Sequence, residues 1–93
     1  MSLPIGSVTV ARPGTPVALV SSGNAVSAVS LRARVDNAGS VFVGDTSVSS
    51  TSGYRLEPGD ELSLSFKETM DLRRIYVDAS NANDGLDYAG VAA

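Results

Sequence analysis

The chain has 93 residues, enough for one domain with a modest hydrophobic core. Its formal net charge of −3 argues against nucleic acid as a partner, because phosphate groups favour a basic surface. Cysteine and histidine are absent, which excludes disulfide bonds, Ser-His-Asp and Cys-His catalytic sites, and zinc sites built on these ligands.

The sequence carries no signal for a membrane. No stretch approaches the roughly 20 apolar residues that a membrane-spanning helix needs, and the first residues lack the basic start and apolar run of a signal peptide. We expect one domain, residues 1–93, in which residues 1–6 form either a flexible leader or an arm that docks on a neighbour. In the docking alternative, Leu3 and Ile5 are candidate contact residues.

The first part of the chain is predicted to form short strands. Val8 and Val10 alternate with polar residues, and a turn at residues 12–14 leads to a second strand at 15–20. Residues 28–36 form the next strand. Its apolar face consists of Val29, Leu31, Ala33 and Val35.

Two further strands are expected after this one. The gap at residues 37–39 contains a glycine and predicts a hairpin into a strand at 40–44. Residues 46–52 are rich in serine and threonine, with Val48 as their one apolar residue. They are predicted either as a short edge strand or as a wide surface loop, and an edge strand joined to a loop is favoured.

The strongest strand signal follows the turn at residues 58–59, which is a Pro-Gly pair. Apolar and polar residues alternate strictly after this turn. Such alternation is typical of an antiparallel sheet that is packed on one side and solvated on the other. The two faces are Leu62, Leu64 and Phe66 on one side and Glu61, Ser63, Ser65 and Lys67 on the other.

The last third of the chain continues the pattern. Residues 67–72 are expected to form a single helical turn or a plain connection, and residues 72–79 a strand. An Asp-Gly pair at 84–85 is predicted as a hairpin turn, because glycine accepts a positive φ. Residues 86–91 are predicted as the final strand.

Seven to eight short strands, with turn signals at roughly ten-residue spacing, predict an all-β fold. We expect an antiparallel β-sandwich, either jelly-roll or Ig-like, or a small barrel. Hydrophobic content is 43%, but the aromatic residues are three tyrosines and two phenylalanines, so the core is thin. A thin core without disulfide bonds or zinc favours association, and a homo-oligomer is expected.

Carboxylates are the groups left for acid–base or metal chemistry. Asp60 and Glu61 are adjacent on a strand and point to opposite faces. The acidic segment 78–87 suggests calcium, but aligning Gly85 with the glycine of an EF-hand loop places Ala82 at a ligand position. An irregular calcium site stays an alternative to a polar hairpin turn, which is favoured. We predict no catalytic residues, no cofactor and no metal.

Arginine and tyrosine residues supply candidate contacts with a partner. Two arginines share the polar face of the 28–36 strand, and two more begin the 72–79 strand. They form either solvated faces with local ion pairs or an interface, since arginine makes directional contacts with carboxylates. Tyr54 is expected either on this surface or as a lid on the end of the sandwich. The candidate interface residues are Leu3, Ile5, Arg32, Arg34, Tyr54, Arg73, Arg74 and Tyr76.

Four segments follow one another in a characteristic order: VFVG at 41–44, GYRLEPGDEL at 53–62, DLRRIYVDA at 71–79 and DGLDY at 84–88. Their order and spacing resemble small β-sandwich virion proteins of tailed bacteriophages, and the nearest group is the head decoration or cement type. The similarity covers about residues 28–90. A Leu-x-Pro-Gly turn also occurs in cupins, but this chain lacks the histidines of metal-binding cupins.

This resemblance implies a structural, non-enzymatic role. The expected partner is the major capsid protein or another virion protein. Several copies, expected as trimers, would bind the outer shell across capsomer junctions and stabilise it without a cofactor. The protein would be made in the cytoplasm of the bacterial host and end in the virion. Alternatives are a neck, tail or carbohydrate-binding host-attachment module and, from a third class, a small β-domain enzyme or metal binder.

Overall fold

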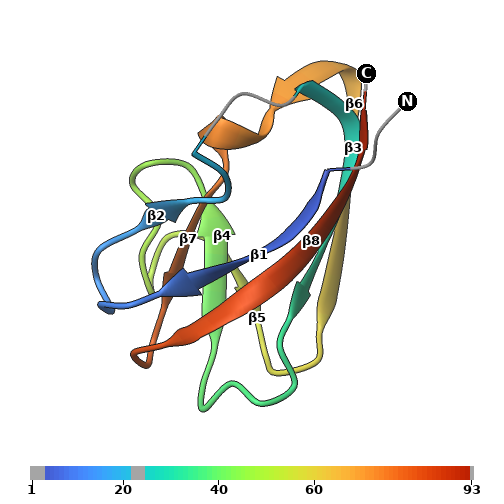
Figure 1. Cartoon of the computed structure of the whole chain (residues 1–93). Coiled ribbons are helices and arrows are strands. Elements are labelled where there is room, and N and C mark those ends of the chain that lie inside the picture. Colours follow the sequence, from blue (N-terminus) through green and yellow to red (C-terminus); the bar gives the residue numbers. More distant parts are fainter. Residues whose placement is uncertain (1–3, 22–24, 93) are drawn as a thin grey trace.

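The computed structural model describes residues 4–21 and 25–92, which form two antiparallel four-stranded sheets packed face to face (Figure 1). Sheet A has the strand order β1-β8-β3-β6, and sheet B has the order β2-β7-β4-β5. The strands are β1 (Ile5–Val10), β2 (Val17–Ala18), β3 (Ala25–Ala33), β4 (Val41–Gly44), β5 (Tyr54–Leu56), β6 (Glu61–Asp71), β7 (Tyr76–Ala79) and β8 (Asp84–Ala92). A short 3₁₀ helix, η1 (Leu72–Arg74), precedes β7.

This strand order is that of a jelly roll. Each connection except the one from β4 to β5 carries the chain from one sheet to the other. The structure therefore confirms the predicted all-β antiparallel sandwich, and the strand order selects the jelly roll among the alternatives. The eight strands of the described residues agree with the predicted seven to eight.

The core between the two sheets is aliphatic. Its largest fully buried side chains are Val10, Val26, Val29, Leu31, Val41, Leu56, Leu72, Val77 and Leu86. Burying one such side chain contributes about 1.5–3 kcal/mol to stability. This set, drawn from the described residues, contains no aromatic side chain, so the core is as thin as the composition indicates.

The two predicted turns that combine proline and glycine are confirmed. Gly14 and Gly59 each have a φ of 87°, a left-handed conformation that glycine adopts at little cost. Each turn is closed by a backbone hydrogen bond, and the one before β6 runs from Asp60 N to Glu57 O at 2.9 Å. β2 and β6 begin shortly after these two turns.

The predicted hairpin at residues 37–39 is wrong, because β3 lies in sheet A and β4 lies in sheet B. The crossing connection is anchored at the start of β8. Asn37 exchanges hydrogen bonds of 2.8 and 3.0 Å with the backbone of Gly85, and the Asp84 carboxylate accepts bonds of 2.9 and 2.8 Å from two backbone N–H groups of the connection. Since β3 ends before the connection, Val35 is 67% exposed instead of lying on the apolar face.

The Asp-Gly pair at 84–85 is not a hairpin turn either, since β7 and β8 belong to different sheets. Both residues lie inside β8, and the non-glycine residue with a positive φ, 69°, is Asn83. Gly85 is needed for space: a Cβ here would collide with the carbonyl oxygen of Val8 and the side chain of Arg34.

Residues 46–52 form a loop, which was the alternative to the favoured edge strand, and the edge of sheet B is β5. Val48, the apolar residue of this loop, is buried at 3% exposure. It packs over Gly44, and since the neighbouring Val43 belongs to the core, Gly44 faces outward. The loop therefore covers part of the outer face of sheet B.

Several element boundaries differ from the prediction, among them that of β3, which begins at Ala25 and not at residue 28. The helical turn is η1 and not residues 67–72, because β6 continues to Asp71. The Asp71 carboxylate caps η1 by accepting a hydrogen bond of 2.9 Å from Arg73 N. As a result β7 begins later than predicted, at Tyr76. In addition, β2 covers only two residues of the predicted 15–20 strand.

Candidate functional site

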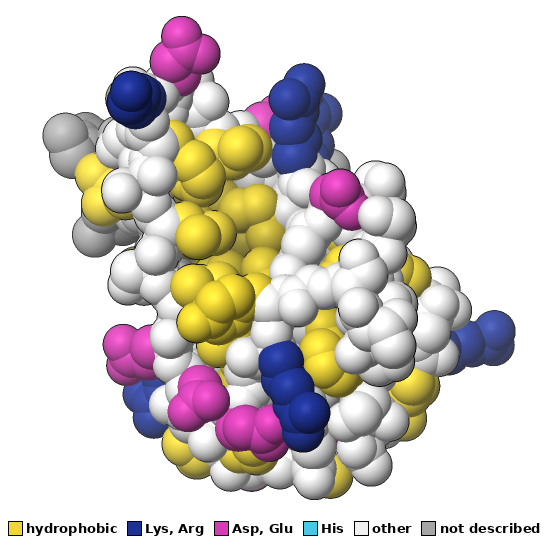
Figure 2. Space-filling model, turned by 180° about the vertical axis from the view of Figure 1, so that it is seen from behind, with side chains coloured by type: hydrophobic (Ala, Val, Ile, Leu, Met, Phe, Trp, Pro, Cys, Tyr) yellow, Lys and Arg dark blue, Asp and Glu magenta, His cyan; other side chains and the backbone are white. Residues whose placement is uncertain are grey.

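One side of the sandwich is open, and hydrophobic side chains gather in a hollow on the face shown in Figure 2. We call this hollow the β6 groove. It has a volume of about 520 Å³ and lies between β6 and the β4–β5 side of sheet B. Its lining consists of Val43, Gly44, Asp45, Tyr54, Leu62, Leu64, Phe66, Met70, Arg74 and Ile75.

The floor of the groove is the alternating strand. Leu62, Leu64 and Phe66 pack against the core and are half-buried, whereas the residues between them are exposed, as the alternation predicts. Full coverage is not reached because β5, the facing edge of sheet B, has 3 residues and β6 has 11. The groove is thus the space over β6 that the short strands of sheet B do not fill.

The rim of the groove is polar and aromatic. Tyr54 is 58% exposed at the start of β5, and Arg74 lies at the end of η1. The Asp45 carboxylate accepts hydrogen bonds from the hydroxyl and backbone N–H of Ser47, at 2.7 and 2.9 Å, which hold its pKa below the ordinary value. An apolar floor inside a polar rim is the usual anatomy of a surface that binds another protein.

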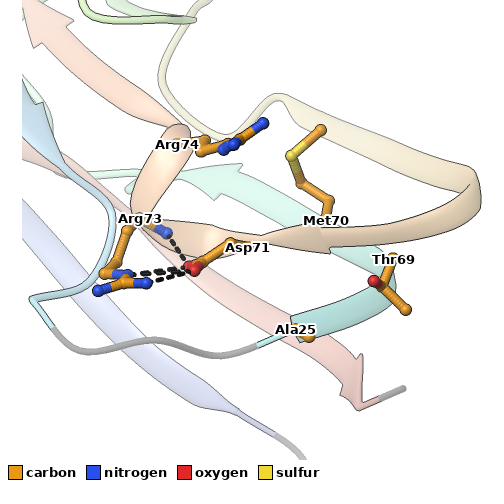
Figure 3. A pocket seen from close by; sticks show the side chains of 6 residues that line it. All are labelled: Ala25, Thr69, Met70, Asp71, Arg73 and Arg74. Atoms are coloured by element: carbon orange, nitrogen blue, oxygen red, sulfur yellow. Dashed lines mark hydrogen bonds and ion pairs between the residues drawn. The ribbon is translucent and has the colours of Figure 1, made fainter.

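A second hollow of about 620 Å³ lies beside η1 and is lined by Ala25, Thr69, Met70, Asp71, Arg73 and Arg74 (Figure 3). Here Arg73 pairs with Asp71 at 2.7 Å, and the hydrogen bonds that the guanidinium donates to the carboxylate raise the pKa of Arg73. Arg74 points away from that pair, toward the side of Met70 (Figure 3), and lines both hollows. The lining of the larger hollow is about as polar as it is apolar, whereas that of the β6 groove is almost entirely apolar, so we take the β6 groove as the stronger binding surface.

The predicted interface residues divide between different parts of the molecule. Tyr54 and Arg74 meet at the β6 groove, and Arg73 and Arg74 meet at the hollow beside η1. Arg32 lies on β3 between two acidic positions of the neighbouring strands, opposite Glu61 of β6 on one side and Asp87 of β8 on the other. Arg32 lies away from the β6 groove, where it lines one hollow with Arg34 and another with Ile5.

Arg34 has a structural position. It follows β3, and its Nη2 donates hydrogen bonds to Thr9 Oγ1 at 3.1 Å and to the backbone oxygen of Asn83 at 3.3 Å. These bonds tie the end of β3 to β1 and to the connection that enters β8. Arg34 thus holds three segments together at this end of the sandwich.

The other candidate contacts also lie away from the groove lining. Ile5 is 68% exposed in β1, where it pairs with Ala89 of β8. Tyr76 is half-buried at the start of β7. Leu3 lies outside the described residues. Of the predicted 1–6 arm, residues 5 and 6 belong to β1.

Two of the acidic residues of segment 78–87, Asp78 and Asp84, accept hydrogen bonds from the backbone. Asp78 is buried and accepts hydrogen bonds from Gly14 N at 2.9 Å and Ala79 N at 2.8 Å. Asp84 is also buried and holds the connection between β3 and β4. In residues 4–21 and 25–92, no group of three or more histidine, cysteine, aspartate or glutamate residues is arranged to hold a metal ion.

Sequence reasoning predicted the faces of β6 but missed the groove. Leu62, Leu64 and Phe66 were expected to face the packed side, and Met70 and Val43 were not singled out as surface residues. The available signal was the mismatch in length between β6 and its short neighbour in the sequence, but strand ends are hard to place from sequence alone. The groove depends on that mismatch.

No protein-family model matches the chain, and no curated protein or solved structure matches it either. Within the described part of the chain, no helix is long and apolar enough to cross a membrane.

Proposed function

We propose that this protein is a structural component of a tailed-bacteriophage virion, a head decoration or cement protein. In this role it binds the outer shell across capsomer junctions and stabilises the assembled particle. Its partner is the major capsid protein, and its chemistry is adhesion without a cofactor. The resemblance of the segments at 41–44, 53–62, 71–79 and 84–88 to such proteins supports the proposal.

The observation that carries the proposal is the β6 groove. Leu62, Leu64 and Phe66 remain half-buried in the free chain, so a partner that fills the groove removes more apolar surface from water. Such burial is worth about 25 cal/mol per Å². Tyr54 and Arg74 on the rim are residue types that often carry binding energy.

The fold supports this role by analogy alone. Jelly rolls occur in viral capsid domains, and also in lectins and cupins, so the strand order does not choose between functions. Binding of many copies to the assembled lattice, and not to free subunits, would stabilise the shell by mass action. That stabilisation requires a binding surface and no catalytic group.

A binding assay with purified protein and mature shells tests the proposal. The protein is expected to co-sediment with the shells and to raise the temperature at which they rupture. Tyr54→Ala removes an exposed rim side chain and is expected to weaken binding about thirtyfold or more, the loss that defines a binding hot spot.

The matched control is Val35→Ala, which trims an exposed side chain outside the groove lining and is expected to bind like the native protein. Equal binding by both variants would show that the groove is not part of the contact with the shell. No binding of the native protein to shells, together with binding to tails or glycans, would replace decoration by the neck, tail or host-attachment alternative.

A further inference from the structure

The outer edge of β6 has no partner strand in the described part of the chain. β6 stands last in sheet A, and its ladder is made with β3. At 11 residues it is also the longest strand. A long edge strand presents a row of backbone N–H and C=O groups that can pair with another strand. The outer edge of β6 can therefore pair with a strand of another chain.

We infer that a second copy of this chain occupies the edge, with the two β6 strands antiparallel around a two-fold axis. The sequence of β6 is complementary to itself when Leu64 of one copy lies opposite Leu64 of the other. Glu61 then lies opposite Lys67, so opposite charges meet at both ends of the new ladder. On the inner face, Leu62 lies opposite Phe66.

The alternation of β6 restricts the register. A slip of one residue would set inward-facing side chains against outward-facing ones, which the pleat forbids. In one direction, the next allowed register places Glu61 opposite Ser65 and leaves the lysine beyond the ladder. In the other direction it places Leu62 opposite Glu68. Of these three registers, the one centred on Leu64 pairs Leu62 and Leu64 with apolar residues and Glu61 with Lys67.

The dimer has a consequence for the β6 groove. A two-fold axis perpendicular to sheet A keeps the inner faces of both copies on the same side. Leu62, Leu64 and Phe66 of the two copies then form one continuous floor, walled by sheet B of each copy. Use of this doubled groove by the shell rests on the proposed function, whereas the dimer itself does not. It also differs from the expected trimer.

Cysteine crosslinking tests the register, and the native chain has no cysteine to interfere. Ser63 of one copy is placed opposite Ser65 of the other, and both are exposed. Opposite residues in an antiparallel pair lie about 4.5–5.5 Å apart between Cα atoms, within the range of a disulfide. Mixing Ser63→Cys protein with Ser65→Cys protein is expected to give a disulfide-linked pair under mild oxidation.

Two controls accompany the mixture. Each cysteine variant alone is expected to crosslink more slowly, because its own cysteines lie diagonally across the axis. Mixing Ser65→Cys with Ser7→Cys, an exposed position on the opposite edge of sheet A, is expected to give no crosslink above the collision background. Equal crosslinking in all mixtures would overturn the proposed register.

Charge reversal and sedimentation complete the test. The native protein is expected to sediment as a dimer without shells. Lys67→Glu sets two carboxylates opposite each other at both ends of the ladder, and is expected to raise the dimer dissociation constant about tenfold. The double variant Glu61→Lys, Lys67→Glu restores both pairs and is expected to restore the dimer. A native monomer or trimer would overturn the inference, while failure of shell binding by an intact dimer would count against the proposed function alone.

Discussion

The Asp84 carboxylate accepts two backbone hydrogen bonds, of 2.9 and 2.8 Å, from the connection between β3 and β4. It is buried, at 5% exposure. A buried N–H group that loses its acceptor pays its desolvation cost, typically about 1–3 kcal/mol. A residue that the sequence offered as a candidate calcium ligand is therefore a structural clamp in the jelly roll.

Replacement of this acid gives a direct prediction. Asp84→Ala is expected to lower the free energy of unfolding by about 2–4 kcal/mol, since two N–H groups lose their acceptor. Asp87→Ala is the matched control on the same strand, because Asp87 is exposed, and it is expected to change stability by less than about 0.5 kcal/mol. Urea denaturation measures both values. Equal losses would show that the clamp contributes little.

Glu57 links β5 to the start of β4. Its carboxylate accepts a hydrogen bond from the Ser40 hydroxyl at 3.0 Å and pairs with Arg55 at 2.6 Å. The Ser40 bond, and then the Arg55 pair, hold the pKa of the Glu57 carboxyl below its ordinary value. A group with a lower pKa in the folded state contributes stability above its unfolded pKa, and this contribution is lost as the pH falls through the folded pKa.

The pH dependence follows from this sign. Thermal stability of the native protein is expected to fall on acidification below about pH 4.5, where glutamate begins to take up protons in the unfolded chain. Glu57→Gln is expected to make this acid-induced fall shallower. Melting curves of both proteins from neutral to acidic pH provide the measurement. Parallel pH profiles for the two proteins would argue against a role for this carboxylate.

At the scale of elements, β6 shows how far alternation can be used. The pattern predicted which side chains face inward, and Leu62, Leu64 and Phe66 do so. It could not predict how completely they are covered, because coverage depends on β5, which belongs to the other sheet. Periodicity indicates to which face of a strand a side chain points, whereas its burial also depends on the length of the strand that lies opposite.

Turn signals have a similar limit. Glycine at residues 14 and 59 marked turns that the structure confirms, because a positive φ is a local property. The segments at 37–39 and 84–85 carry the same kind of signal, but the hairpins predicted there do not form, because the first segment connects the two sheets and the second lies inside β8. Whether the next strand pairs beside the last one or faces it across the core is decided by the packing of the whole sandwich.

The loop at residues 46–52 gives a third case. Its single apolar residue, Val48, is buried over Gly44 on the outer face of sheet B. A segment of serine and threonine with one valine carries no clear period. Its position could not be predicted because the space for Val48 is created by two glycines, Gly44 and Gly53, that lie 9 positions apart in the sequence.

At the scale of the whole molecule, the jelly roll keeps its two sheets unequal. Strands β3, β6 and β8 of sheet A have 9, 11 and 9 residues, while the strands of sheet B have 4 or fewer. This inequality leaves part of β6 uncovered and so produces the groove, while the outer edge of β6 is open because β6 stands last in sheet A. The two sheets bury the core between them. The β6 groove, which they leave uncovered, is apolar and suited to contact with another protein.

The measurement that tests this account most directly is a copy count of the protein in purified phage particles by quantitative mass spectrometry. A decoration protein is expected in a fixed, high ratio to the major capsid protein. Particles that lack the protein are expected to rupture more easily than particles that carry it. Absence from the particles, or a few copies that accompany tail proteins, would contradict the account.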